Sequence, residues 1–316
     1  MRTLSVKSPL DIDFYKYSMA YFVWKHFGDA IVKYKFKNRT KGMPLAHLEK
    51  TVAYELGLIQ KQYRYTEDEL FYISNIKAPG TDRNAFPSEF INFLATVQLP
   101  DINVFVADND LQIETEGPWK NSIWWETMAL SAVNFICYKD LAQLSVKDYK
   151  AIGEERLMGK IAKLRQHPRI LFSEFGTRRR LSFEWQRFIV ETLERELPEQ
   201  LYGTSNVLLA KELGIRPVGT QAHELFMIGS RLFGDLDEDI LGSHGKILDM
   251  WYETLGPEFS TALTDTFGTE FFFRDFGKER AEKWKGMRQD SGHPDVFARA
   301  QKGFYEKHGL TPEMIK

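Results

Sequence analysis

The second half of the sequence alternates between short apolar runs and longer segments with helical spacing. In the longer segments apolar positions recur every three or four residues, which is typical of helices with one buried face. Such segments cover residues 181–197, 204–214, 221–234, 269–284 and 293–309. The short apolar runs predict β-strands within residues 169–177, 215–220, 259–267 and 285–291. Because strand and helix alternate at intervals long enough for crossover helices, we expect a parallel sheet.

Residues that start or end helices support these assignments. Ser205 is expected to cap the helix over residues 204–214, and Gly214 is expected to end it. Pro294 lies near the first helical position of the last segment, where a missing N–H is tolerated.

The first 140 residues follow a different pattern. Residues 30–40 alternate as a strand does, and residues 120–135 are mostly apolar, which predicts a buried helix. The two faces of the strand are Ile31, Lys33 and Lys35 against Val32, Tyr34 and Phe36. We therefore expect a mixed α+β domain over residues 1–140, whose helices lead into an α/β core over residues 141–316.

Polar residues gather where each predicted strand of the second half ends. The clusters are Gly176-Thr177-Arg178, Gly219-Thr220, Thr264-Asp265-Thr266 and Arg288-Gln289-Asp290-Ser291. In a parallel α/β barrel the active site lies at the carboxyl ends of the strands. The pattern therefore predicts a barrel-type arrangement, with an open doubly wound sheet as the alternative.

Composition narrows the class of protein. The 316 residues are 43% hydrophobic, enough for one large domain and a smaller one, and the formal net charge is -2. That balance argues against binding of nucleic acid or a membrane surface. The single cysteine, Cys137, excludes a disulfide within the chain, and its apolar setting favours a buried residue over a nucleophile. Without a signal peptide or an apolar run of about 20 residues, we expect a cytoplasmic protein.

Three adjacent arginines, Arg178, Arg179 and Arg180, are the first candidates for substrate binding. Guanidinium groups suit bidentate contacts with phosphate or carboxylate. The preceding Gly-Thr would let backbone amides approach an anion, although such triplets also occur on solvated surfaces. Arg288 is a second, separate candidate for an anion.

Carboxylates and a histidine follow the other strands. Asp265 and Asp290 suit sugar hydroxyls, a metal or a developing positive charge, and residues 290–292 would also fit a turn with a helix cap. His223 lies where a helix begins, in a structural or a functional role. Together these groups suit a substrate with phosphates and hydroxyls, beside a small anion.

Five segments in order carry a family resemblance. They are "PLDIDFYKYSM", "FGTRRR", "GTSNVLLAKELGIRPVGTQAHE", "LTDTFGTEFFFRDF" and "GMRQDSGHP", between about residues 8 and 310. The combination closely resembles the nicotinate phosphoribosyltransferases, whose fold is that of the type II phosphoribosyltransferases. It favours this family over the nicotinamide and quinolinate phosphoribosyltransferases, whose motifs differ.

The resemblance implies a reaction. Nicotinate and phosphoribosyl pyrophosphate give nicotinate mononucleotide and pyrophosphate with Mg²⁺, driven by ATP hydrolysis, in NAD biosynthesis. It implies that His223 becomes a phosphohistidine, which imidazole chemistry permits. Asp290 and Asp265 are candidates to stabilise the oxocarbenium-like transition state, or to hold Mg²⁺ or ribose hydroxyls.

The resemblance also implies where the substrates bind. Tyr15 would stack on the pyridine ring, with ordinary aromatic packing as the alternative, and Thr220 and Arg288 would bind nicotinate. Arg178, Arg179 and Arg180 would hold pyrophosphate. Members of the family are homodimers with shared active sites, so a second copy of the chain is an expected partner.

Two departures from the family pattern raise alternatives. His293 replaces the usual acidic residue of "DSGDP", which affects the expected Mg²⁺ or ribose contacts. A "GIGT" loop for the 5-phosphate does not occur in the sequence, which would leave the barrel incomplete. The chain is then expected to be a fragment, a shortened homologue completed by a partner, or an inactive binding subunit. A nicotinamide phosphoribosyltransferase is a further alternative.

Overall fold

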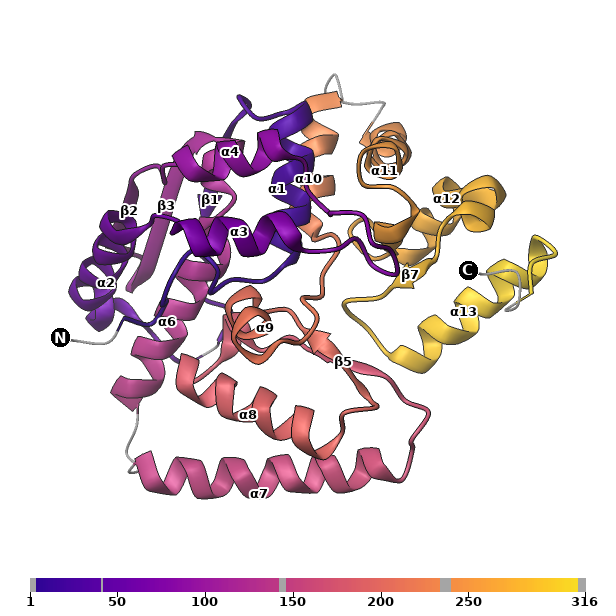
Figure 1. The fold of residues 1–316 in the computed structure, drawn as a ribbon. Coiled ribbons are helices and arrows are strands. Elements are labelled where there is room, and N and C mark those ends of the chain that lie inside the picture. The colour runs from indigo at the N-terminus through magenta and orange to yellow at the C-terminus, as the bar shows by residue number, and fades with distance from the viewer. Residues whose placement is uncertain (1–3, 41, 142–145, 234–239, 312–316) are drawn as a thin grey trace. The chain divides into compact units, whose positions relative to one another are not determined.

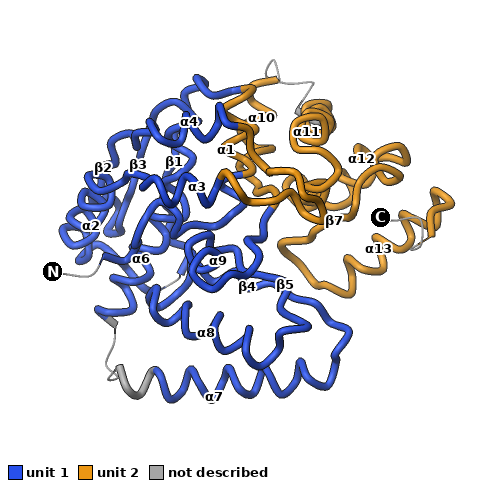
Figure 2. The backbone as a smooth tube through the Cα atoms, viewed as in Figure 1, with its two compact units in different colours: residues 1–17, 27–73, 88–219 blue, residues 18–26, 74–87, 220–316 orange. Residues whose placement is uncertain are grey.

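The computed structural model describes residues 4–40, 42–141, 146–233 and 240–311 (Figure 1). By packing, the chain divides into two compact units made of interleaved segments (Figure 2). Unit 1 comprises residues 1–17, 27–73 and 88–219, and unit 2 comprises residues 18–26, 74–87 and 220–316. The division falls within helix α1 (Tyr15–His26). The predicted domain boundary after residue 140 stays a prediction, because these units group segments by contact rather than by chain order.

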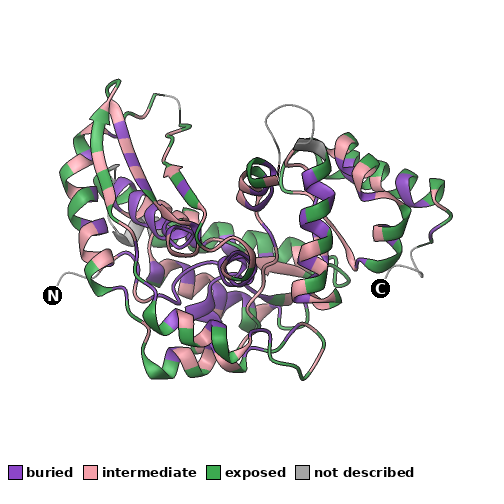
Figure 3. Cartoon of the chain, turned by 90° about the horizontal axis from the view of Figure 1, so that it is seen from above, coloured by how far each residue is buried: buried purple, intermediate pink, exposed green. Residues whose placement is uncertain are grey.

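Unit 1 contains an antiparallel three-stranded sheet in the order β1-β3-β2. Its strands are β1 (Ile31–Lys35), β2 (Ile102–Ala107) and β3 (Asp110–Pro118). Asp108 and Asn109 join β2 to β3 with φ angles of 52° and 58°, the left-handed pair that a tight hairpin requires. Buried positions alternate along β3 (Figure 3). On β1, Val32 is buried while Ile31, Lys33 and Lys35 are exposed, which confirms the predicted alternation.

Helices make up most of the rest of unit 1. They are α2 (Glu49–Gln62), most of α3 (Glu67–Asn75), α4 (Ser88–Thr96), α5 (Trp119–Ser122), α6 (Trp125–Leu141), α7 (Val146–Arg165), α8 (Phe183–Glu196) and α9 (Val207–Leu213), with the 3-10 helices η1 (Ala46–Leu48) and η2 (Thr177–Arg179). The buried helix predicted over residues 120–135 is present as α5 and α6. Trp119 of α5, Trp125 of α6 and Trp124 between these helices are almost fully buried. Cys137 on α6 is buried as predicted, and burial raises the pKa of its thiol.

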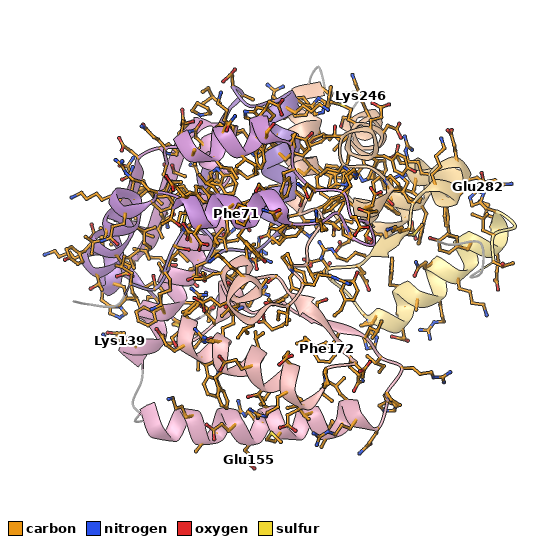
Figure 4. All side chains as sticks on the ribbon, viewed as in Figure 1. Phe71, Lys139, Glu155, Phe172, Lys246 and Glu282 are labelled. Carbon is orange, nitrogen blue, oxygen red and sulfur yellow. The ribbon has the colours of Figure 1, made fainter. Side chains whose placement is uncertain are left out.

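Two parallel strands follow in unit 1, β4 (Phe172–Glu174) and β5 (Leu201–Thr204). The sequence predicted β4 but not β5, which is only four residues long. The strand predicted over residues 215–220 is wrong: it is reduced to a single bridge between Thr204 and Pro217. Proline lacks the N–H that a continuing ladder needs. Phe172, labelled in Figure 4, packs with Leu201 against a core of α7 and α8 residues.

Helix α9 begins one residue later than its predicted cap implied. The side chain of Asn206, not of Ser205, accepts the capping hydrogen bond, from the N–H of Leu209. The hydroxyl of Ser205 instead donates to Asp13. Gly214 ends the helix with a φ of 67°, as predicted.

Unit 2 pairs β6 with β7 in parallel. Its elements after α1 are α10 (His223–Phe233), α11 (Ile240–Leu255), η3 (Pro257–Phe259), β6 (Thr261–Leu263), α12 (Thr269–Lys283), β7 (Gly286–Arg288) and α13 (Pro294–Lys307). The predicted α10, α12 and α13 are confirmed, with Pro294 in the first turn of α13. Helix α11 was not predicted. The core of unit 2 is aromatic and includes Phe226, Trp251, Phe259, Phe272 and Phe276.

Both parallel strand pairs agree with the predicted α/β class. Within the described residues, the strands form three separate sheets rather than one closed ladder. None of the described helices is long and apolar enough to cross a membrane.

Candidate active site

The residues predicted to bind substrate fall into two groups, one in each compact unit. Tyr15 and the arginine triplet belong to unit 1, while Thr220, His223, Asp265, Arg288 and Asp290 belong to unit 2.

The first two arginines of the triplet end η2, which follows β4, and Arg180 comes directly after η2. Helix α6 holds this turn in place. The hydroxyl of Ser131 donates to the carbonyl of Thr177 at 2.8 Å, and the amide of Asn134 donates to the carbonyl of Arg178 at 2.7 Å. Because the chain turns here, the three arginines have different surroundings. Arg180 is buried, Arg178 is half-buried and Arg179 is exposed.

Arg180 is 5% exposed and uses its guanidinium within the protein. Its two terminal nitrogens donate to the carboxylate oxygens of Asp11 at 2.5 and 2.7 Å. The same nitrogens donate to the carbonyl of Ser5 and to the side chain of Gln186. A guanidinium so engaged has little left for a substrate, so we assign Arg180 a structural role and narrow the predicted anion site to its two neighbours.

Arg178 belongs to a cluster of opposite charges. Its Nε lies 3.4 Å from Oδ2 of Asp13, its Nη1 lies 3.2 Å from Oε1 of Glu126, and its guanidinium lies 5.5 Å from the ring centre of Tyr15. The buried amine of Lys16 lies 2.5 Å from Oε2 of Glu126. The cluster thus holds two cations and two carboxylates beside one aromatic ring.

Asp13 is buried within this cluster. Burial raises the pKa of Asp13 above its usual value, and the Arg178 guanidinium and the Ser205 hydroxyl offset only part of that rise. Arg179 differs from both neighbours, because its exposed side chain has no polar partner among the residues that the structure describes. Within the triplet, Arg179 is therefore the guanidinium with most donors left for an anion.

Tyr15 is 4% exposed, and Gly219 packs on its backbone. A Cβ added to Gly219 would lie 2.5 Å from the amide nitrogen of Tyr15, closer than side chains are found. The glycine of the "VGTQAHE" segment is therefore required by close packing. The stacking role of Tyr15 stays a prediction, and it would need the covered ring to be reached by the base.

In unit 2, the segment after Gly219 leads into α10. The hydroxyl of Ser18 donates to the carbonyl of Thr220 at 2.7 Å, and Leu263 N–H donates to the side chain of Gln221 at 3.3 Å. These contacts fix the segment to α1 and to β6. His223 is then the first residue of α10, which agrees with its predicted place where a helix begins.

The imidazole of His223 lies between a hydroxyl and a carboxylate. Its Nδ1 lies 3.0 Å from Oγ1 of Thr266, and its Nε2 lies 3.4 Å from Oδ2 of Asp290. Thr266 follows β6 and Asp290 follows β7, so the parallel pairing of these strands brings both groups to one histidine. The side chain of His223 is 37% exposed.

Arg288, the last residue of β7, is ion-paired with Asp290. Its Nη1 donates to Oδ1 of Asp290 at 2.6 Å, and its Nη2 donates to the carbonyl of Gln221 at 3.2 Å. Burial acts to raise the pKa of Asp290, but hydrogen bonding and charge from Arg288, helped by His223, hold it below its usual value. Asp290 is therefore a carboxylate at neutral pH, and a nicotinate carboxylate would meet a guanidinium that already has one anionic neighbour.

Asp265 presents one satisfied and one unsatisfied oxygen. Its Oδ2 accepts from the backbone N–H of Ser291 at 2.9 Å and from the Ser291 hydroxyl. Its Oδ1 is buried and has no hydrogen-bond partner within the described part of the chain. Within the described residues there is no group of three or more His, Cys, Asp or Glu that could hold a metal ion. Magnesium bound through one or two carboxylates and substrate phosphates needs no such group, so Asp265 fits it.

His293 is exposed just before α13, where its Nδ1 contacts Oδ1 of Asp295. An acidic side chain, that of Asp295, thus lies beside the position where the family pattern has an acidic residue. The effect of His293 on the expected Mg²⁺ or ribose contacts stays a prediction.

Sequence reasoning missed several charged residues beside the candidates. Glu126 and Lys16 were not singled out, although a lone carboxylate within the apolar 120–135 segment was a signal. Glu174, at the end of β4, was missed as well. It accepts hydrogen bonds from Gly176 N–H, Gln186 and Thr204. Burial raises the pKa of Glu174 above its usual value, and these hydrogen bonds offset only part of the rise.

Solved structures of similar shape identify the fold. A nicotinate phosphoribosyltransferase from Porphyromonas gingivalis superposes with a TM-score of 0.86 at 27% sequence identity, over 97% of this chain and 76% of that one. One from Vibrio cholerae has the same TM-score at 24% identity, over 99% of this chain and 72% of that one. The fold is that of a type II phosphoribosyltransferase.

The sequences agree with this class and make it specific. The family model of the nicotinate phosphoribosyltransferase N-terminal domain matches residues 10–134, and that of the nicotinate phosphoribosyltransferase family matches residues 170–313. A nicotinate phosphoribosyltransferase of Neisseria meningitidis serogroup A is 33% identical over 315 residues, which span 96% of this chain and 75% of the relative. A serogroup B relative is also 33% identical over the same shares. The chain belongs to the nicotinate phosphoribosyltransferase family, as its motifs predicted.

Proposed function

We propose that this chain joins nicotinate to the phosphoribosyl group of phosphoribosyl pyrophosphate, and that ATP drives the reaction through a phosphate carried on His223. Family membership supports the first part. The second part is carried by the geometry of His223, whose imidazole lies between Thr266 and the charged Asp290 at the start of α10.

The surroundings of His223 assign the roles of its two nitrogens. A carboxylate only accepts hydrogen bonds, so the Nε2 that faces Asp290 carries the proton. Nδ1 then keeps its lone pair, which accepts from the Thr266 hydroxyl and becomes the nucleophile when that hydroxyl rotates away. In the proposed step Nδ1 forms a bond to the terminal phosphorus of ATP, and ADP leaves with the electron pair of the broken P–O bond.

The glycosyl transfer asks for charge stabilisation and orientation. The pyridine nitrogen of nicotinate bonds to the anomeric carbon, and pyrophosphate leaves with the electron pair of the C–O bond. Positive charge develops on the ribose, and the carboxylates of Asp265 and Asp290 are the proposed groups that stabilise it. Arg178 and Arg179 are proposed to bind pyrophosphate, whereas Thr220 and Arg288 are proposed to bind nicotinate, with Tyr15 stacking on its ring.

Magnesium would be held by Asp265, with Asp290 as the second choice, and would supply positive charge to the departing pyrophosphate. The unsatisfied Oδ1 of Asp265 supports this assignment. The hydrogen bond from Ser291 orients the same carboxylate.

Three further features follow from the family and belong to the proposal. The parallel strand pairs would be parts of one α/β barrel. The working enzyme would be a cytoplasmic homodimer with shared active sites.

The test is a direct assay of the purified chain. We expect nicotinate mononucleotide to form from nicotinate and phosphoribosyl pyrophosphate with Mg²⁺, and to form faster when ATP is added. Folded protein that makes none at high concentration would refute the proposed transfer. Formation that ATP does not change would refute the ATP coupling alone.

A further inference from the structure

A second histidine of unit 2, His244 on α11, is buried in a box of aromatic rings. It is 2% exposed. Its ring centre lies 4.7 Å from that of Phe226, 5.5 Å from Phe271, 5.7 Å from Phe272 and 6.2 Å from Phe267. A polar ring in such a place loses hydration, so burial costs free energy unless a hydrogen bond compensates.

One carboxylate supplies that compensation. Nδ1 of His244 lies 2.6 Å from Oδ2 of Asp275 on α12, and because a carboxylate only accepts, Nδ1 donates. Arg280 fixes this part of α12, since it donates to the carbonyl of Asp275 at 2.6 Å and binds both oxygens of Asp249 on α11 at 2.7 Å. The orientation of the His244 ring is therefore fixed from α12 as well as by packing.

Two of the four rings adjoin the candidate site. Phe226 follows His223 by three residues on α10, which places both on one side of that helix. Phe267 comes directly after Thr266, the residue whose hydroxyl lies 3.0 Å from Nδ1 of His223. His244 thus contacts the neighbours of both partners in the His223–Thr266 hydrogen bond.

We propose that His244 is a positioning residue: together with Asp275 it fixes the loop after β6 against α10, and so holds Thr266 on Nδ1 of His223. The inference rests on the proposed role of His223. Packing alone would be served as well by phenylalanine, which fills a similar volume without a polar group. A histidine bonded to a carboxylate also fixes the ring orientation, because only one of the two flipped orientations of the imidazole keeps the hydrogen bond.

The main test compares His244→Phe with His26→Phe. His26 is a matched control, since its ring also packs on an aromatic ring of unit 2, that of Phe22, which itself packs on Trp251, and its Nε2 bonds Thr254. Thr254 lies ten residues beyond His244 on α11, or about 15 Å at the rise of an α-helix. We expect the His244 variant to lower kcat about tenfold, as a misplaced catalytic group does, with the KM for nicotinate within about twofold. The control should keep its kcat.

Two readouts separate positioning from general loss of structure. The Nδ1 NMR shift of His223 should report an accepted hydrogen bond from Thr266 in the wild type and its loss in His244→Phe, while Nε2 stays protonated against Asp290 in both. Thr266→Val should abolish the effect, so that the double variant has the kcat of Thr266→Val alone.

A folded His244→Phe variant with the kcat of the control, or with unchanged His223 shifts, would overturn the inference. Should that variant fail to fold, Asp275→Leu tests the same link, because it removes the acceptor and leaves the aromatic box. We expect Asp275→Leu to lower kcat and to change the His223 shifts as His244→Phe does. An unchanged kcat or unchanged His223 shifts would overturn the inference. His223→Ala with undiminished activity would instead refute the proposed role of His223, and the Nδ1 shift of His223, measured in chains that retain it, would still test His244.

Discussion

Arg180 and Asp11 form a buried, bidentate ion pair between residues 169 positions apart in the sequence. The pair joins the arginine triplet to the N-terminal segment that carries Tyr15. Asn206 and the backbone N–H of Lys7 donate to the same carboxylate, so Asp11 has partners on both of its oxygens. Within the triplet, Arg180 therefore supports the fold, and Arg178 and Arg179 remain the arginines proposed to bind substrate.

Loss of the Arg180 guanidinium should destabilise the chain strongly. Arg180→Ala leaves Asp11 buried without its counter-ion, and we expect the free energy of unfolding to fall by about 3–5 kcal/mol. Arg179→Ala is the matched control, because its exposed side chain should contribute less than about 0.5 kcal/mol. Urea unfolding of both variants measures the difference. Equal stability of the two would show that the Arg180 pair does not hold the fold.

Arg288 should decide between nicotinate and nicotinamide. A charge-assisted bond to a carboxylate contributes about 1.5–3 kcal/mol, so we expect Arg288→Ala to lower kcat/KM for nicotinate roughly tenfold or more. A carboxamide offers no matching charge, and the value for nicotinamide should change much less. Steady-state kinetics with both bases measure the ratio. A fall by the same factor for both would mean that Arg288 acts through Asp290 and not on the base.

His223 should carry an acid-labile, alkali-stable phosphate. Incubation of the chain with radiolabelled ATP should label the wild type, and His223→Ala should take up none. His47→Ala controls for the loss of a histidine, since His47 is exposed and bonds Asp140 in unit 1. A label that survives in His223→Ala places the phosphate on another residue.

Glu174 should make the free energy of unfolding decrease as pH rises. Because its pKa is raised in the folded protein, the unfolded carboxyl ionises first as pH rises above about 4.5. Its contribution to stability is then complete below that pH and declines as pH rises through the folded pKa. Urea unfolding from pH 4 to pH 8 should show a smaller decline for Glu174→Gln than for the wild type. Identical pH profiles would contradict the raised pKa.

Gly219 should tolerate no side chain. A Cβ there would press on the backbone of Tyr15. Because overpacking of this kind costs about 1–3 kcal/mol, Gly219→Ala should lower the free energy of unfolding by about that amount. Gly159, in the middle of α7, has open space around its Cα, so Gly159→Ala should be neutral or stabilising by up to about 1 kcal/mol. Thermal unfolding of the two variants compares them. A Gly219→Ala variant as stable as Gly159→Ala would rule out the close approach.

The sequence was sufficient for features that depend on neighbours in the chain. The alternation around Val32 in β1, the left-handed Gly214 after α9 and the proline at the start of α13 all appear as predicted. Hydrophobic periodicity and backbone preference act over a few residues, so both can be recognised from the order of residues in the chain. The motifs that determined the family are equally local, and three of the five contain both the end of a strand and the start of the next helix.

Only the tertiary structure decided which partners the local candidates contact. In the folded chain Arg180 pairs with Asp11, and Asn206 rather than Ser205 caps α9. The strand predicted over residues 215–220 is reduced to one bridge at Pro217. The tertiary structure also brought Thr266 and Asp290 from two different strand ends to the imidazole of His223. A charged or capping side chain binds whichever partner the folded chain brings within about 3 Å, and that distance is set by packing between remote segments. The order of residues determined the kinds of groups in this site, and the fold determined their pairing.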